Sequence, residues 1–209
     1  MIFDQGSLYH IYNQGNNRQK IFFKRDNYLF FLKKINQHIM PHADILAWCL
    51  MPNHFHLMVH VKQVFVPVTD GVTSATDGVT WSHPVSKLKE ISFNHNIGIL
   101  LRSYARAINK QEQRVGALFR EETKAECVTP IEGITPSFYN TSSGALIHVS
   151  NSEMEYPQIC FDYIHFNPVS ARLVVRPEEW EFSSYRDYCG IRDGKLINRK
   201  IAKEFGIEF

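Results

Sequence analysis

The sequence lacks the features that mark membrane-spanning proteins, secreted proteins and proteins stabilised by structural metal ions. No apolar run reaches the roughly 18 residues that a transmembrane helix needs. The start, residues 1–12, has no basic segment followed by an apolar stretch, so we expect no secretory signal. No Cys-x-x-Cys pair occurs, which argues against a zinc ribbon or a redox motif; the cysteines are Cys49, Cys127, Cys160 and Cys189. These absences predict a cytoplasmic protein with reduced thiols.

Charge is small in sum and uneven along the chain. The formal net charge is +2, yet residues 1–124 hold 15 Lys and Arg against 9 Asp and Glu, and residues 125–209 hold 8 against 12. A basic first part suits a polyanionic partner, because each phosphate that a cation neutralises releases counterions. An ordinary solvated surface explains the same imbalance, so charge alone supports nucleic-acid binding only weakly.

Length and composition fit one globular domain. The chain has 209 residues, of which 44% are hydrophobic and 21% charged, enough to bury a core without disulfides. Two stretches differ from the rest: 62–85 contains the pentapeptide Thr-Asp-Gly-Val-Thr twice, and 126–150 is rich in Pro, Ser, Thr and Gly. We therefore expect a single domain over 1–209 with insertions at 62–85 and 126–150.

Hydrophobic periodicity predicts an α+β fold. The expected strands are 7–13, 43–51, 54–61 and 124–129, and the expected helices are 27–39, 86–113 and 153–167. Asp26 is expected to cap the first helix, and Asn167-Pro168 to end the last. The order strand, helix, strand, strand, helix, strand is ferredoxin-like. We expect an antiparallel sheet with helices on one face, and an additional helix carrying Tyr163.

Three histidines alternate along the third predicted strand. Since alternate side chains share a face, His54, His56 and His60 point one way together with Met58. The other set, which should face the core, is uniformly apolar: Phe55, Leu57, Val59 and Val61. Two neutral imidazoles about 7 Å apart along a strand can chelate a divalent cation. The pattern His-x-His is often incidental, however, and we interpret His60 and the earlier His10 as structural.

The last predicted helix supplies a second candidate site. Tyr163 and Asn167 are four residues apart and so share one helical face. The phenol can act as a nucleophile and the amide oxygen as a metal ligand, although a buried tyrosine with a helix-ending asparagine explains the pair equally. His165 projects about 200° around the helix from Tyr163 and should not join them.

Four cations recur every fourth residue at the end of the second predicted helix. They are Arg102, Arg106, Lys110 and Arg114. This spacing predicts a basic ridge along one side of the helix, which is a solvated face or a track for DNA phosphates.

The two candidate sites occur together in segments that resemble one family. Residues 48–59 contain Met-Pro-Asn-His-x-His and residues 163–174 begin Tyr-Ile-His-x-Asn-Pro; 9–18, 116–119 and the final Trp-x-Phe-Ser-Ser-Tyr at 180–185 add to the match. Together they are similar to the REP-associated tyrosine transposases, relatives of the single-tyrosine insertion-sequence transposases in the HUH (His–hydrophobe–His) nuclease superfamily. The segment after Phe119, Arg-Glu-Glu-Thr-Lys, departs from the family's more basic pattern.

This resemblance implies specific roles. His54, His56 and Asn167 would bind Mg²⁺ or Mn²⁺, and Tyr163 would be the nucleophile that forms a 5′-phosphotyrosine. The partner would be single-stranded or hairpin DNA. We expect Arg18 and the basic ridge to contact it, and whether the chain acts alone or as a homodimer stays open. Two alternatives remain: a metal-dependent nuclease that uses water, and a catalytically silent DNA-binding module. No general base can be identified from the sequence.

Overall fold

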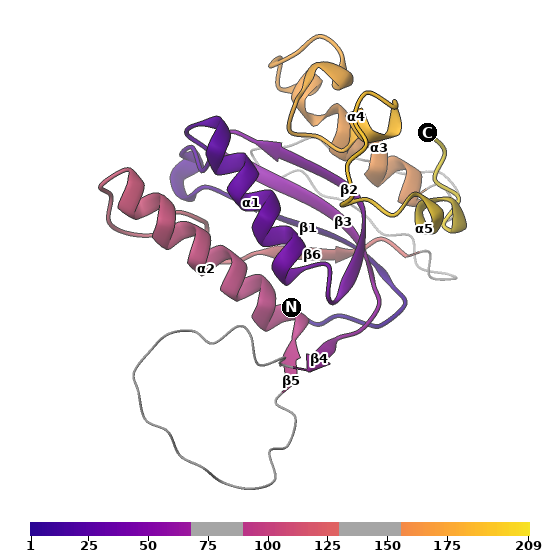
Figure 1. Cartoon of the computed structure of the whole chain (residues 1–209), viewed down its shortest axis with the longest axis horizontal. Coiled ribbons are helices and arrows are strands. Elements are labelled where there is room, and N and C mark those ends of the chain that lie inside the picture. The colour runs from indigo at the N-terminus through magenta and orange to yellow at the C-terminus, as the bar shows by residue number, and fades with distance from the viewer. Residues whose placement is uncertain (68–89, 130–155) are drawn as a thin grey trace, which may run out of the picture.

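The computed structural model describes residues 1–67, 90–129 and 156–209 and shows a four-stranded sheet (Figure 1). Its strands are β1 (Leu8–Gln14), β2 (Ala43–Met51), β3 (His54–Val61) and β6 (Lys124–Cys127). They lie in the order β2-β3-β1-β6, and every neighbouring pair is antiparallel. The predicted α+β class with an antiparallel sheet is confirmed.

Helices cover both faces of this sheet. On one face lie α1 (Arg25–His38) and α2 (Phe93–Gln111), whose apolar side chains share a core cluster with Phe55, Leu57, Val59 and Val61 of β3. On the other face lies α3 (Tyr156–Ser170), which packs with Met58 of β3 in a second cluster. The alternation of β3 therefore separates two layers as the sequence predicts, and the tyrosine-bearing helix lies opposite the other two.

Shorter elements complete the described chain. They are η1 (Asn16–Arg18), β4 (Phe65–Pro67), β5 (Glu90–Ser92), η3 (Pro177–Glu179), α4 (Tyr185–Tyr188) and α5 (Arg199–Glu204). β4 pairs with β5 in a separate two-stranded sheet. The proposed insertions at 62–85 and 126–150 fall largely outside the described residues, and Glu126 and Cys127 at the start of the second belong to β6. No helix among the described residues is long and apolar enough to cross a bilayer.

Three predicted helix boundaries are wrong. α1 begins at Arg25, before the expected cap Asp26, because the Asn27 side-chain oxygen accepts the backbone N–H groups of Phe23 and Lys24. Glu90–Ser92 form a strand, so α2 starts later than residue 86, with the Ser92 hydroxyl accepting from the His95 N–H.

α3 continues past Asn167-Pro168 to Ser170. A proline biases the preceding residue away from the helical region without excluding it. Here Pro168 is buried, and the Ala171 N–H still donates to the Asn167 carbonyl at 2.9 Å, which extends the helix by one turn. Asn167 consequently projects from within a helix instead of from its fraying end.

Candidate active site

The two predicted imidazoles lie near the start of β3, on the face that α3 covers. His54 pairs with Gln14 of β1, and His56 with Tyr12, so both come from the centre of the sheet. Their ring centroids are 5.0 Å apart and the ring planes are nearly perpendicular. His56 is only 4% exposed, whereas His54 is half-buried at the rim.

Helix α3 brings the predicted tyrosine and asparagine to these histidines. Asn167 Oδ1 lies 3.1 Å from His54 Nε2, and Asn167 Nδ2 lies 3.3 Å from His56 Nε2. The Tyr163 ring stands edge-on to the His56 ring, with centroids 5.4 Å apart. Residues separated by more than 100 positions therefore meet at one place, which is the juxtaposition that the predicted site requires.

The tautomer of His54 follows from its other nitrogen. His54 Nδ1 lies 2.6 Å from Asn53 Oδ1, and the Asn53 amide nitrogen donates to the Arg18 carbonyl at 3.4 Å. Since this leaves the Asn53 oxygen as acceptor, the His54 proton is on Nδ1 and Nε2 presents a lone pair. That lone pair faces Asn167 Oδ1, so two acceptors oppose each other at 3.1 Å.

A cation between opposed acceptors relieves their repulsion, so these residues fit a divalent metal. His56 completes the set, because its Nδ1 is 2.9 Å from His10 Nε2 and its own Nε2 points at Asn167. The donors are then two imidazole nitrogens and one amide oxygen, a mixed set that suits Mn²⁺ and Mg²⁺ among other divalent ions. The part of the chain described by the structure contains no group of three or more His, Cys, Asp or Glu suited to a metal.

Burial keeps the imidazoles neutral, which is the form that binds metal. Desolvation lowers the pKa of His54, and it lowers the pKa of His56 further below its ordinary value, where neighbouring His54 and His10 add to the effect. Burial also lowers the pKa of His10 to about 3. These lone pairs are therefore available at neutral pH without competition from protons.

The Tyr163 phenol is held in its protonated form. Burial raises its pKa above the ordinary value of 10, and the thiol of Cys160 adds to the rise, while a hydrogen bond to Asn167 acts in the opposite direction. A nucleophilic role therefore requires a positive charge beside the oxygen or a group that accepts the proton.

Two further residues adjoin the site that the sequence did not predict there. His10, interpreted from the sequence as structural, contacts His56 and lies 5.9 Å from the Tyr163 ring. Tyr12 lies directly across from His56 and donates its hydroxyl to Glu126 Oε1 at 2.6 Å. The feature that places His10 at the site is the strand register. His10 pairs with Met58, so it is a diagonal neighbour of His56 on the same face of the sheet.

The predicted basic ridge does not adjoin this site. Arg102, Arg106 and Lys110 are exposed on α2, which covers the opposite face of the sheet. Arg114 lies beyond the end of α2, where it donates to Gln19, so the ridge spans three residues and not four. Arg102 also lines a groove of about 920 Å³ between α2 and residues 117–125.

Arg18 is separate from that ridge and closer to the histidines. It follows β1 in a left-handed backbone conformation (φ 58°), and its carbonyl oxygen accepts from the Asn53 amide beside His54. The backbone of Arg18 therefore supports the site, whatever its side chain contacts.

Comparisons with known proteins bear on the fold. No protein-family model matches the chain, and no curated protein does. Among solved structures, the chain is similar to a REP-associated tyrosine transposase bound to a REP hairpin, with 15% sequence identity, a TM-score of 0.54 and coverage of 95% of each chain. At this identity the likeness shows a shared fold, the one that the sequence motifs anticipate.

Proposed function

We propose that this chain is a transposase-type endonuclease that cuts and rejoins single-stranded or hairpin DNA through a 5′-phosphotyrosine at Tyr163. The observation that carries the proposal is the approach of Tyr163 and Asn167 on α3 to the two imidazoles on β3. The similar solved structure supports it, because that protein is a tyrosine transposase bound to a DNA hairpin and shares the fold over 95% of both chains.

In this proposal His54, His56 and Asn167 hold a divalent cation. Mg²⁺ or Mn²⁺ there supplies Lewis-acid stabilisation for the charge that develops on the scissile phosphate. Asn53 orients His54 through the 2.6 Å contact to Nδ1, and His10 does the same for His56. Such outer partners fix the tautomer and direction of each ligand.

The reaction at Tyr163 is a transesterification. The phenolic oxygen attacks phosphorus and forms a bond to the 5′-phosphate; the bond to the 3′ oxygen breaks, and that oxygen leaves as a 3′-hydroxyl. The phenol gives up its proton and the leaving oxygen takes one. Because the phosphotyrosine ester preserves a phosphodiester-like linkage, a 3′-hydroxyl from a second strand can reverse the step and join the DNA.

One assay separates this proposal from its alternatives. The protein is incubated with a labelled DNA hairpin that carries a single-stranded extension and Mn²⁺, and denaturing gels are searched for a covalent adduct. An adduct that EDTA prevents supports the tyrosine enzyme. Cleavage without an adduct supports a water-using nuclease, and metal-independent binding without cleavage supports a silent DNA-binding module; either result contradicts the proposal.

Asn53→Ala is expected to weaken metal binding. Loss of the acceptor for His54 Nδ1–H releases the ring orientation and tautomer, so the Mn²⁺ dissociation constant should rise about tenfold. Mn²⁺ titration followed by electron paramagnetic resonance measures this. Asn94→Ala, which removes an exposed amide on α2, serves as the matched control. Equal Mn²⁺ affinity in the two variants would remove Asn53 from the site.

Arg102→Ala is expected to weaken hairpin binding without affecting the chemistry. If Arg102 neutralises one phosphate, the slope of log affinity against log salt concentration should fall by about one unit. Fluorescence anisotropy at several salt concentrations gives this slope, with Lys33→Ala on the exposed side of α1 as the control. An unchanged slope would place the DNA away from α2.

A further inference from the structure

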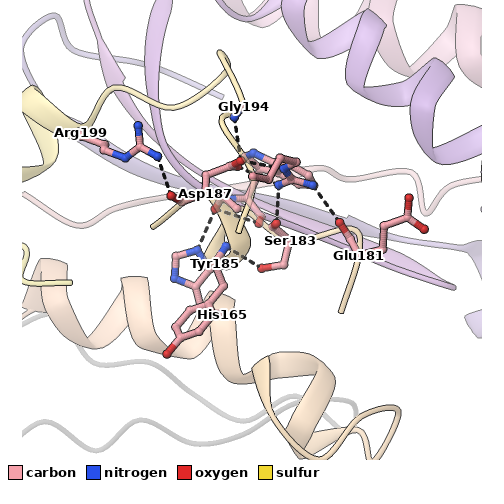
Figure 2. A network of polar contacts seen from close by, with 10 residues as sticks. His165, Glu181, Ser183, Tyr185, Asp187, Gly194 and Arg199 are labelled. Atoms are coloured by element: carbon pink, nitrogen blue, oxygen red, sulfur yellow. Dashed lines mark hydrogen bonds and ion pairs between the residues drawn. The ribbon is translucent and has the colours of Figure 1, made fainter. Parts of the chain in front are cut away.

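The side of α3 that turns away from Tyr163 is tied to the segment that follows the helix. His165 is fully buried, and its Nε2 lies 2.7 Å from Ser184 Oγ. Figure 2 shows the His165 ring reaching from α3 toward the segment that carries Ser183 and Asp187. The Ser184 backbone N–H in turn donates to the Trp48 carbonyl of β2 at 2.9 Å. One serine therefore connects α3 to the edge of the sheet.

The donor and the acceptor can be assigned for each hydrogen bond of the Ser184 hydroxyl. A hydroxyl has one proton and two lone pairs. Ser184 Oγ accepts from the Trp48 N–H at 2.8 Å and donates to the Trp48 carbonyl at 3.2 Å, which leaves one lone pair for His165. The imidazole is therefore the donor, with its proton on Nε2. His165 Nδ1 has no partner among the described residues, which fits, because a buried bare acceptor is tolerated better than an orphaned N–H.

Ser184 belongs to a segment that is itself firmly held. We call residues 180–188 the C-terminal anchor. Along β2, the Phe182 carbonyl accepts from the Leu50 N–H at 2.9 Å and the Tyr188 hydroxyl donates to the Leu46 carbonyl at 2.6 Å. The buried Asp187 carboxylate accepts hydrogen bonds from Arg192 and from the Gly194 N–H, and these hold the C-terminal end of the anchor (Figure 2). Ser184 is thus a fixed point relative to the sheet.

We propose that His165 and Ser184 are positioning residues that set the rotation of α3 and so place Tyr163 and Asn167 against His54 and His56. The inference rests on the proposed function. His165 lies midway between Tyr163 and Asn167 in sequence, so a rotation at His165 displaces both. Asn167 contacts His54 and His56 directly, but it is one of the groups to be placed. Elsewhere α3 packs on the sheet through apolar residues such as Cys160 and Ile164, and apolar packing is not directional. The hydrogen bond between His165 and Ser184 is directional and can therefore fix the rotation of α3 about its axis.

The size of the effect follows from helix geometry. Side-chain tips lie about 5–6 Å from a helix axis, so a rotation of about 10° moves them by about 1 Å. A displacement of about 1 Å at reacting groups can cost about 100-fold in rate. A small loss of angular control at His165 is therefore enough to slow attack by Tyr163, even when the fold persists.

Three variants test this role. His165→Leu removes the donor at similar volume, His165→Gln keeps an N–H at a comparable reach, and Ile35→Val perturbs the core from α1 on the other face. With saturating hairpin and Mn²⁺, adduct formation should slow about 30–100-fold in His165→Leu, with hairpin affinity unchanged within about twofold. His165→Gln should recover most of the rate, and Ile35→Val should retain it.

A second measurement needs neither DNA nor metal. With selectively labelled rings, a nuclear Overhauser contact between Tyr163 and His56 should appear in the wild type and in His165→Gln, and be lost in His165→Leu. If the wild type forms no adduct, the proposed function fails, while this contact still tests the positioning. If His165→Leu matches Ile35→Val in both adduct rate and ring contact, the positioning role is overturned.

Discussion

Tyr163→Phe should abolish the covalent adduct while hairpin binding persists. The substitution removes the attacking oxygen and leaves the ring that packs edge-on to His56. Removing a covalent nucleophile typically costs four or more orders of magnitude in rate, so we expect a loss of at least about 10⁴-fold. Phosphate contacts away from the site provide most of the affinity, so the dissociation constant should change by less than about threefold.

The matched control for this variant is Tyr28→Phe. Tyr28 is a buried tyrosine on α1, stacked on Phe182 at a centroid distance of 3.8 Å, on the other side of the sheet. The Tyr28→Phe variant should form the adduct at the wild-type rate, as measured by quenched time courses on denaturing gels. Strand cleavage that survives in Tyr163→Phe would instead identify water as the nucleophile and reject the tyrosine mechanism.

His56→Ala should eliminate cleavage and adduct formation and leave most of the DNA affinity. This variant removes one of the two proposed imidazole ligands and also the partner of His10 Nε2. Loss of the metal removes several kcal/mol of charge stabilisation, which corresponds to about 10³-fold or more in rate. Adduct formation at increasing Mn²⁺ concentration, together with anisotropy on the same hairpin, separates lost chemistry from lost binding.

His60→Ala is the internal control, because His60 shares the face of β3 but lies further along, near Asp44 and Phe205. It should keep wild-type cleavage and Mn²⁺ dependence. If His56→Ala cleaves as well as His60→Ala, the metal assignment on β3 is wrong, even if Tyr163 remains essential.

The alternation of β3 was the most informative part of the sequence. Period-two hydrophobicity separated Phe55 and Leu57 from His54 and His56, and the structure places the two sets in different layers. The pairing of Tyr163 with Asn167 followed from helical spacing in the same way. Both are local patterns, which the neighbouring residues alone determine.

Features that depend on tertiary contacts were not accessible in this way. The contact of His10 with His56 needs the register between β1 and β3, which no local pattern encodes. The early start of α1 depends on the side chain of Asn27, and the extension of α3 through Pro168 depends on burial of the ring. The placement of Arg114 beyond α2 shows that a four-residue spacing continues past the end of the helix that suggests it.

The two-residue turn at Pro52 and Asn53 determines which side chains of β3 face each side of the sheet. Both carbonyls are engaged, that of Pro52 by the N–H of Ile21 and that of Asn53 by the N–H of Gly15. Deleting one residue here would exchange the faces of the strand, sending both imidazoles into the apolar layer and Phe55 toward α3. Such a chain would lose its core together with the proposed site, so the same turn is needed for folding and for the arrangement of the candidate residues.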